Sequence, residues 1–541
     1  MRRPIMSMLA GLALTAGTLL GTGPAQAATG NGHPAAATPP AEFGTDWHDP
    51  LTAAPPVAKP ATPSCRVTLA QAQFRDFTPY RGSYTPPAAC GTRWSKVVLR
   101  LDGTVKGRQY DRLGHLAVGG VEVLRTSTPE PSPDGIAWHV EKDVTRYADT
   151  LRRPQPVEML IGNVVDDTYT GVIDVKVTAT FYTARGAVRA ADAPDRVLPL
   201  GDGSGTTPVT LPRNGERVVA EVYATGSGGG CEEFWYLTVP ERAAYSCKAP
   251  GGPNREVQVS VDGRLAGIAS PFPHVWTGGW SNPFLWYVLP APRAFDVKPV
   301  EYDLTPFAAL LNDGRPHRIQ VSVLGVPPGT SGWSTPANLL LWQDHGRRVV
   351  TGALTRHEQG EPVDSVTYTP GAQQELDARA GHRLTTAGYL DTSHGRVTTT
   401  VTRTLAHTSA HRFTEAEDLD ALDATWRDDE SVTRGATTSR TQRTYRLDGT
   451  ITIGADDLLR TVISLTDRAD STVLRGRSPL SWSHLDDRYD GDASWTLNVP
   501  RDQRHAVGTS AERYRSHGSA GCYDRTLRTV QGTLTEDRTR C

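Results

Sequence analysis

Apolar and polar residues alternate along extended stretches of this chain. Successive side chains of a β-strand point to opposite faces, so a period of two is typical of strands with one buried face. The alternation occurs in KVVLRLDGTV (96–105), VIDVKVTATFY (172–182), RVVAEVYAT (217–225), EVQVSVDGRLAG (256–267) and RIQVSVLGV (318–326). Helical periodicity is rare, and we expect only a short helical turn within 303–314. The chain is therefore predicted to be all-β.

The length of 541 residues is too great for a single β-sandwich. A short polar linker with a proline occurs at 183–196, and the region after about 350 is rich in Thr, Arg and Asp. We expect a first β-sandwich at 63–187, a second at 188–347, and a β-rich C-terminal domain at 348–541. Asp-Gly pairs at 102–103, 262–263 and 448–449 predict tight hairpin turns.

The N-terminus has the pattern of a secretory signal peptide. Arg2 and Arg3 precede a short apolar run, which ends in small residues at Ala25-Gln26-Ala27. We expect cleavage after about Ala27, hence a signal peptide at 1–27 and a secreted protein. Residues 28–62 are mostly Ala, Pro, Thr and Gly, and are expected to form a disordered leader. No later segment has the length of a membrane helix, so no membrane partner is expected.

Six cysteines lie in three short-range couples along the chain. An even number of cysteines in an exported protein predicts disulfides. Fifteen connectivities are possible, and proximity favours Cys65–Cys90, Cys231–Cys247 and Cys522–Cys541. None of the couples has C-x-x-C spacing, so we predict no metal site.

The formal net charge of −2 does not suggest a nucleic-acid partner. The sequence also lacks H-E-x-x-H, G-x-S-x-G, a phosphate-binding loop and a nucleotide-binding glycine fingerprint. These absences make a metalloprotease, a hydrolase with a nucleophile elbow and a nucleotide-dependent enzyme unlikely candidates. What remains is a set of carboxylates among aromatic residues.

The stretch GRQYDRLGHLAVGGVEVLRTSTPEP (107–131) contains the first candidate, Asp111 followed by Arg112. An adjacent arginine favours the ionised carboxylate, which can act as a general base or orient a water molecule. The alternative is a structural ion pair at the start of a strand.

The second candidate is GSGGGCEEFWYLTVP (226–240), whose aromatic residues favour a strand. In a strand, Glu233 and Trp235 would share one face while Glu232 would point to the other. A carboxylate in apolar surroundings is costly unless it is paired, so one glutamate is either paired, solvated or present for chemistry. On this basis Glu232→Gln is expected to be mild.

Two further segments carry weaker signals. The aromatic segment 271–292 contains Trp276 and Trp280, which could stack on sugar rings or belong to a core. Asn163 and Asp166 lie in IGNVVDDTYTG (161–171), where turn formation alone would explain the aspartate.

Several of these stretches together resemble a known family. They are GRQYDRLGHLAVGGVEVLRTSTPEP, GIAWHVEKDVTRY (135–147), IGNVVDDTYTG, EEFWY (232–236), WTGGWSNPFLW (276–286) and VEYDLTPF (300–307). They occur in order across nearly all of 63–347 and are similar to the glycoamidases, the peptide-N-glycanases of the amidase A type. The resemblance implies a hydrolase that releases intact N-linked glycans from asparagine, with N-glycosylated peptides or proteins as partners, no cofactor, and two adjacent jelly-roll-like β-sandwiches.

The more distant amidase F type resembles the chain at Tyr110-Asp111-Arg112 and at Cys231-Glu232-Glu233-Phe234. This similarity implies that Asp111 is the base, that Glu233 is a second active-site acid, and that Arg112 holds the acid or an oxyanion. The family's third acid would fall near Asn163 or Asp166. Substrate contacts are expected from Glu232, Trp235, Asn163, Asp166, Trp276 and Trp280, and the protein is expected to be a monomer.

Two other functions are compatible with the same residues. A glycoside hydrolase also uses two carboxylates, but cuts between sugars. A glycan-binding protein without catalysis would need the aromatic residues but not both acids.

Overall fold

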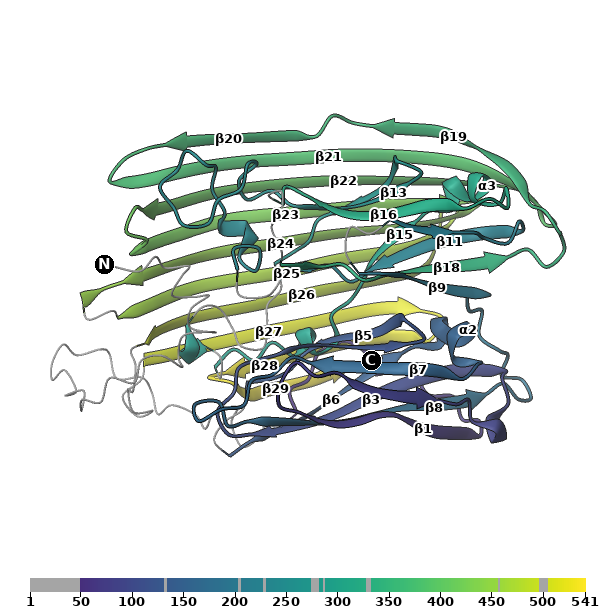
Figure 1. Ribbon diagram of the computed structural model, residues 1–541, viewed down its shortest axis with the longest axis horizontal. Helices are drawn as coiled ribbons and strands as arrows, with labels where there is room; N and C mark the ends of the chain where they lie inside the picture. The colour runs from purple at the N-terminus through teal and green to yellow at the C-terminus, as the bar shows by residue number, and fades with distance from the viewer. Residues whose placement is uncertain are drawn as a thin grey trace.

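The chain folds almost entirely into antiparallel β-strands, which confirms the predicted fold class (Figure 1). The computed structural model describes residues 49–130, 134–202, 206–226, 230–273, 282–285, 288–326, 332–455, 458–495 and 505–541. These residues form four four-stranded sheets, a two-stranded ribbon and one eleven-stranded sheet. None of the helices in this part of the chain is long and apolar enough to cross a membrane.

The first sandwich contains two four-stranded sheets that enclose an apolar core. Their orders are β1-β8-β3-β6 and β2-β7-β4-β5. The strands are β1 (Ser64–Phe74), β2 (Tyr80–Tyr84), β3 (Trp94–Lys106), β4 (Leu113–Val118), β5 (Val121–Ser127), β6 (Ile136–Asp143), β7 (Gln155–Ile161) and β8 (Val172–Thr183). In β6, for example, Ile136, Trp138 and Val140 are buried while the residues between them are not, so the period of two places one face in the core.

The second sandwich repeats this topology. Its sheets have the orders β15-β11-β18-β9 and β10-β16-β13-β14. The strands are β9 (Arg196–Gly201), β10 (Thr206–Val209), β11 (Gly215–Val222), β13 (Glu256–Val261), β14 (Arg264–Ala269), β15 (Val300–Asp303), β16 (His317–Leu324) and β18 (Ala337–Gln343). If the eight strands of either sandwich are counted in chain order, both give sheets 1-8-3-6 and 2-7-4-5, which is the jelly-roll arrangement.

Short elements connect these strands. The ribbon consists of β12 (Thr225–Gly226) and β17 (Trp333–Ser334). The helical turns are η1 (Ala88–Cys90), η2 (Thr145–Tyr147), α2 (Ala148–Leu151), η3 (Trp235–Leu237), η4 (Pro283–Leu285), η5 (Pro292–Asp296), η6 (Thr305–Phe307) and α3 (Ala308–Leu311). The last two confirm the helical turn expected within 303–314.

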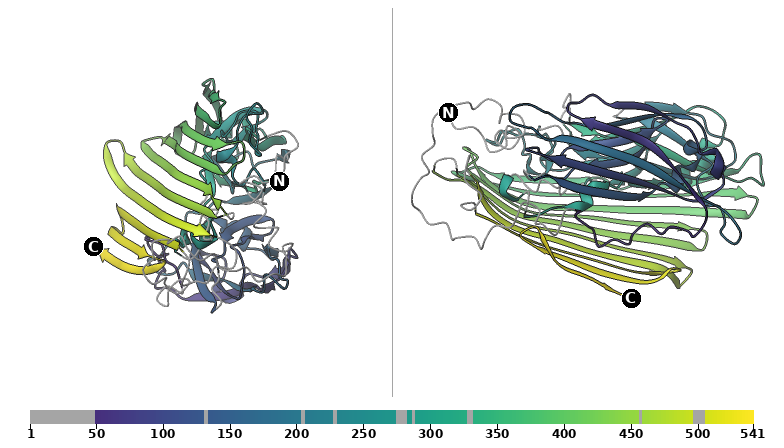
Figure 2. Two further views of the ribbon diagram at one scale, coloured as in Figure 1. Left: turned by 90° about the vertical axis from the view of Figure 1, so that its left-hand side faces the viewer. Right: turned by 90° about the horizontal axis from the view of Figure 1, so that it is seen from below.

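The C-terminal region forms one long meander. The strands are β19 (Thr351–Gln359), β20 (Val363–Thr369), β21 (Gln373–Thr392), β22 (Gly395–Thr414), β23 (Leu419–Arg434), β24 (Thr437–Ile453), β25 (Leu459–Arg475), β26 (Ser478–Trp495), β27 (His505–Gly518), β28 (Gly521–Val530) and β29 (Thr533–Arg540). Figure 2 shows them as a single curved layer that runs along both sandwiches. Its inner face packs against loops of the second sandwich and, through Leu384, Leu390 and Leu405, against the body of that sandwich.

The two sandwiches are joined by apolar contacts, in which Val219 and Leu340 extend the first core, and by buried polar contacts. Arg125 of β5 donates to Glu122 at 2.8 Å and, across the boundary, to Thr225 Oγ1 at 2.6 Å. Asn338 of β18 donates to the Glu122 carbonyl at 2.9 Å. These buried contacts fix the end of β5 relative to β12. Asp111 bonds to Ser127 at the end of β5, and Glu233 lies in the loop that follows β12.

Two expectations about the chain are corrected. Residues 49–62 are not a disordered leader, because hydrogen bonds tie them to two parts of the protein: the Ala53 N–H donates to Glu512 at 3.0 Å, and Lys59 pairs with Glu141 at 2.7 Å. Of the three Asp-Gly pairs, only Asp262-Gly263 turns a hairpin, between β13 and β14. The other two lie inside β3 and β24, and Gly103 is required there because a Cβ would lie 2.4 Å from Trp138.

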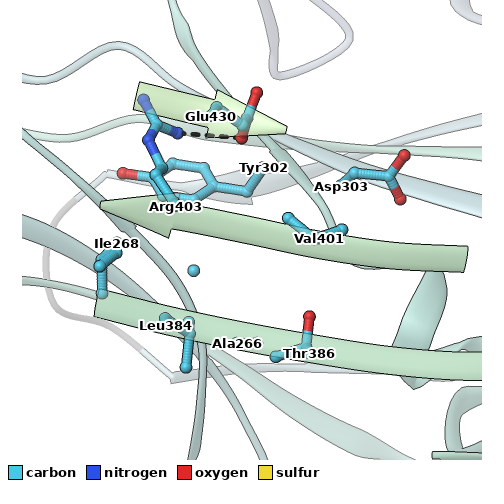
Figure 3. Close-up of a pocket in the computed structure, with 10 residues that line it drawn as sticks. Ala266, Ile268, Tyr302, Asp303, Leu384, Thr386, Val401, Arg403 and Glu430 are labelled. Carbon is cyan, nitrogen blue, oxygen red and sulfur yellow. Dashed lines mark hydrogen bonds and ion pairs between the residues drawn. The ribbon is translucent and has the colours of Figure 1, made fainter. Parts of the chain in front are cut away.

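A small cavity lies where the second sandwich meets the eleven-stranded sheet (Figure 3). Its volume is about 10 Å³, which is room for a single water molecule at most. Arg403 of β22 lies at its edge and pairs with Asp428 at 2.6 Å and Glu430 at 3.4 Å. The cavity is a gap in domain packing and too small to hold a ligand.

Candidate active site

Asp111 lies in the loop between β3 and β4, two residues before β4 begins. Its side chain is half-buried, and its carboxylate accepts a hydrogen bond from Ser127 Oγ at 3.3 Å. Ser127 ends β5, the neighbour of β4 in the sheet. The β4–β5 hairpin therefore fixes Asp111 at one end of the first sandwich. This is the end that contacts the second sandwich.

Glu130 is the principal residue that sequence analysis missed. It lies just beyond the end of β5, is buried, and accepts the backbone N–H of Asp111 at 2.7 Å. Burial and the charge of Asp111 raise the pKa of Glu130 well above its usual value, so Glu130 retains its proton to a higher pH than a solvent-exposed glutamate does. The available sequence signal was an acid between two prolines, in Thr128-Pro129-Glu130-Pro131.

Arg112 is held beside Asp111 by its neighbours in the chain. Its Nε donates to Gln109 Oε1 at 3.0 Å, and its backbone N–H donates to Thr128 Oγ1 at 2.9 Å. Gln109 is fixed in turn by donation to the carbonyls of Val164 and Gly171, at 2.8 and 3.0 Å. The loop that follows β7 therefore orients the arginine through Gln109.

Asn163 and Asp166 both form hydrogen bonds that shape that loop. Asn163 is fully buried, and its amide donates to the carbonyls of Phe74 and Gly171 and accepts the Val164 N–H. Asp166 is exposed and accepts the backbone N–H groups of Thr168 and Tyr169, both at 2.7 Å. The acid whose carboxyl group accepts the Asp111 N–H is Glu130, and a role for Asn163 or Asp166 as the third acid stays a prediction.

The segment around Glu233 is a turn and not the predicted strand. Residues 231–234 form consecutive turns and lead into η3, and the Glu233 N–H donates to the Gly230 carbonyl at 3.0 Å. A disulfide joins Cys231 to Cys247, with Cα atoms 5.4 Å apart. The Phe234 N–H likewise donates to the Cys231 carbonyl, at 3.2 Å, so the alternation argument about Glu232 and Glu233 rests on the wrong backbone.

Glu232 and Trp235 are both buried and held by contacts within the protein. Glu232 is 1% exposed and forms a two-pronged ion pair with Arg255, at 2.7 and 2.8 Å, while Trp333 Nε1 donates to it at 2.5 Å. Trp235 is buried against Trp426 of the eleven-stranded sheet. The ion pair argues against the expectation that Glu232→Gln is mild, because the substitution would weaken the pairing of a fully buried guanidinium.

Asp111 and Glu233 influence each other across the boundary between the sandwiches. Burial raises the pKa of Asp111 to about 6, and the charge of Glu233 contributes in the same direction. Arg112 and the Ser127 hydroxyl act against this increase. The structure thus gathers Asp111, Glu130, Glu233 and Arg112, a set that can exchange protons near neutral pH.

The remaining expectations concern disulfides and tryptophans. Disulfides join Cys65 to Cys90 and Cys522 to Cys541, in addition to Cys231–Cys247. Trp276 and Trp280 lie outside the described residues.

Comparison with known proteins agrees with the resemblance noted in the motifs. The model of a family described as Peptide N-acetyl-beta-D-glucosaminyl asparaginase amidase A matches residues 52–360, more than half of the chain. The chain belongs to this amidase A family. The family match includes Asp111, Glu130 and Glu233, and it ends just after β19. Most of the eleven-stranded sheet therefore lies beyond it.

One curated relative of this amidase A family member is the Peptide-N4-(N-acetyl-beta-glucosaminyl)asparagine amidase A of Prunus dulcis. The two sequences are 33% identical over 381 residues, which cover 64% of this chain and 66% of the relative. Slightly less than two thirds of the relative is thus matched.

Solved structures with some similarity include PNGF-II and PNGase F, a glycosylasparaginase from Flavobacterium meningosepticum. PNGF-II has a TM-score of 0.38 at 14% identity, over 52% of this chain and 65% of that chain. PNGase F has a TM-score of 0.35 at 13% identity, over 52% and 96%. At these TM-scores nothing further about this amidase A family member follows from the similarity.

Proposed function

We propose that this protein hydrolyses the side-chain amide of glycosylated asparagine in N-glycosylated peptides or proteins. The products are an aspartyl peptide and a glycosylamine. One observation carries the proposal: Asp111 has a carboxylate with a pKa of about 6, its backbone N–H donates to a second acid, Glu130, and a third acid on the other sandwich, Glu233, acts on its charge. Membership of the amidase A family supports the choice of the amide as the bond that is cut.

Asp111 is the group suited to activate water. Above pH 6 its carboxylate is ionised, and it can accept a proton from a water molecule as the water oxygen bonds to the amide carbonyl carbon. Ser127 and the neighbouring backbone orient the carboxylate. Arg112 supplies a positive charge for the oxyanion that develops on the carbonyl oxygen.

Glu130 and Glu233 complete the proton balance. Collapse of the tetrahedral intermediate breaks the carbon–nitrogen bond, and the leaving nitrogen takes up the proton that Asp111 received. Glu130 accepts the Asp111 N–H at 2.7 Å, and its raised pKa favours a protonated carboxyl group beside Asp111. Glu233, from the second sandwich, is the acid available to hydrogen-bond the first N-acetylglucosamine or to assist departure of the nitrogen. The glycosylamine later loses ammonia in water.

We also infer that the protein is exported. The signal-peptide pattern ending near Ala27 supports this, as do three disulfides, which persist mainly in oxidising compartments. The monomeric state stays a prediction.

The products of a defined glycopeptide test the proposed reaction. We expect a peptide with aspartate at the former glycosylation site and an intact glycan that ends in a free N-acetylglucosamine. A peptide that keeps one N-acetylglucosamine would instead indicate a glycoside hydrolase. Binding of the glycopeptide without any product would indicate a glycan-binding protein.

A further inference from the structure

The loop that carries Glu233 belongs to the second sandwich in sequence but not in packing. It connects β12 to β13, and its buried apolar residues include Trp235, Leu237, Val239 and Tyr245. These side chains share a core cluster with residues of the eleven-stranded sheet such as Phe413, Leu422, Trp426, Tyr445 and Leu465. No buried member of this cluster comes from a described strand of either sandwich. The loop therefore packs against the eleven-stranded sheet and not against the strands of its own sandwich.

Aromatic contacts hold the beginning of the loop, next to Glu233, against the sheet. Trp235, two residues after Glu233, meets Trp426 edge-to-face at a centroid distance of 5.7 Å. Trp426 is in turn stacked on His407 of the adjacent strand, at 4.8 Å and an interplanar angle of 8°. Edge-to-face and offset-stacked pairs favour particular orientations as well as burial. The backbone next to Glu233 is consequently fixed relative to β22 and β23.

Buried hydrogen bonds hold a later part of the same loop, at Tyr245 and Ser246, against the sheet. The Tyr245 hydroxyl donates to Asp420 at 2.5 Å, and His411 contacts the other Asp420 oxygen at 2.5 Å. The next residue, Ser246, donates its N–H and its hydroxyl to Glu417, at 2.6 and 3.0 Å. Asp420, His411 and Glu417 are each at most 2% exposed. Hydrogen bonds to buried charged groups are among the stronger ones in proteins, so this end of the loop is firmly held.

The disulfide connects this anchor to the candidate active site. Cys247 lies two residues after Tyr245, and Cys231 lies two residues before Glu233. A displacement of Tyr245 is therefore transmitted through the covalent bridge to the turn that contains Glu233.

A second loop of the same sandwich rests on the same sheet. The side-chain amide of Asn282 is fully buried and donates to the carbonyls of Leu459 and Ala493, at 3.2 and 2.9 Å. The Ser270 N–H donates to Asp428 at 3.2 Å. Both long loops that leave the second sandwich near the candidate site thus depend on the sheet for their position.

We propose that the eleven-stranded sheet positions Glu233 for catalysis, with Tyr245 and Asp420 as positioning residues that anchor its loop. This proposal rests on the proposed amidase function. It gives a catalytic purpose to a C-terminal region that lies mostly outside the family match.

The test compares Tyr245→Phe with Tyr84→Phe in the full chain. Tyr84 is a matched control, because its buried hydroxyl also makes one hydrogen bond, to the Leu151 carbonyl at 2.7 Å, but in the first sandwich. A small misplacement of a catalytic group lowers turnover, so we expect kcat of Tyr245→Phe to fall on the order of tenfold with KM within about twofold. Tyr84→Phe should keep its kcat. Hydrogen–deuterium exchange of residues 230–247 should accelerate in Tyr245→Phe alone.

Glu417→Gln provides a second variant, which removes charge from the same anchor while retaining an oxygen acceptor for Ser246. It should show the same pattern in smaller degree. Equal kcat in Tyr245→Phe and Tyr84→Phe would overturn the proposal, as would unchanged exchange in 230–247 for both anchor variants. An inactive wild-type protein would refute the proposed reaction and with it the catalytic purpose of the anchor, whereas the exchange data would still report whether the sheet holds the loop.

Discussion

The backbone N–H of Asp111 donates a 2.7 Å hydrogen bond to the carboxyl group of Glu130, nineteen residues further along the chain. Burial and the charge of Asp111 raise the pKa of Glu130, so the two acids are coupled through this hydrogen bond and electrostatically. The pair lies at the end of β5, the strand that contacts the second sandwich through Arg125.

Replacement of Glu130 separates these two effects. Glu130→Gln keeps an oxygen that can accept the Asp111 N–H but removes the titratable carboxyl group, so we expect turnover to fall about a hundredfold with the fold intact. Glu130→Ala also leaves that N–H without its acceptor, at a cost of about 1–3 kcal/mol in the free energy of unfolding. Steady-state kinetics and chemical denaturation measure the two quantities. Full activity of Glu130→Gln would exclude a role for the titratable Glu130 carboxyl group.

The pH dependence of kcat/KM should report the pKa of Asp111. Burial and the charge of Glu233 raise this pKa to about 6, so the general base is lost as the pH falls through that value. Because Glu233 raises the pKa, the acid limb of residual activity in Glu233→Gln should move to lower pH. Because Arg112 lowers it, the limb of Arg112→Gln should move to higher pH. Limbs that move in the opposite directions, or not at all, would contradict the assignment of Asp111 as the base.

Glu232 and Glu233 should differ in the property that they affect. Removal of the Glu232 charge leaves Arg255 buried without an ionised partner, and loss of one partner of a buried ion pair costs about 3–5 kcal/mol. We therefore expect Glu232→Gln to lower the midpoint of denaturation strongly. Glu233→Gln, at a half-buried turn, should change the midpoint little while turnover falls sharply. Comparable midpoints for the two variants would refute this division.

The strands of the sandwiches were predictable from sequence because packing against a core imposes an alternation of apolar and polar residues on each strand. Each strand, such as β6 with Ile136, Trp138 and Val140, has one apolar face against a core. In the C-terminal sheet the inner face carries His407, Ser409 and His411 as well as apolar residues. The alternation there is hidden, and sequence indicates a β-rich region but not a single layer packed on loops.

The site was only partly predictable, for a related reason. Asp111 and Glu233 were indicated by a family resemblance. The turn that holds Glu233 depends on Trp426 and Asp420, which lie more than 170 residues away, so aromatic residues alone suggested a strand. Glu130 reaches Asp111 only because β4 and β5 form a hairpin, and its spacing matches no motif used to read the sequence.

The Cys231–Cys247 disulfide should support activity more than stability. In the chain-entropy description, closure of a loop of this length contributes about 3 kcal/mol. Contacts of Tyr245 and Ser246 with the sheet retain part of the loop structure without it. We expect replacement of both cysteines by serine to lower turnover sharply, since Glu233 is then less well fixed, and to shift the melting temperature modestly. A large loss of melting temperature with normal turnover would reverse this interpretation.

The central claim is that Asp111 activates a water molecule that attacks the asparagine amide. Hydrolysis of a glycopeptide in heavy-oxygen water, with the wild-type protein and with Asp111→Asn, tests it most directly. The wild-type protein should give a peptide whose new aspartate contains the heavy isotope. Asp111→Asn should fold normally and form this product at least about a hundredfold more slowly, as expected for loss of a general base. Heavy oxygen found on the released sugar at the site of the cut, with asparagine unchanged in the peptide, or undiminished turnover by Asp111→Asn, would contradict the account.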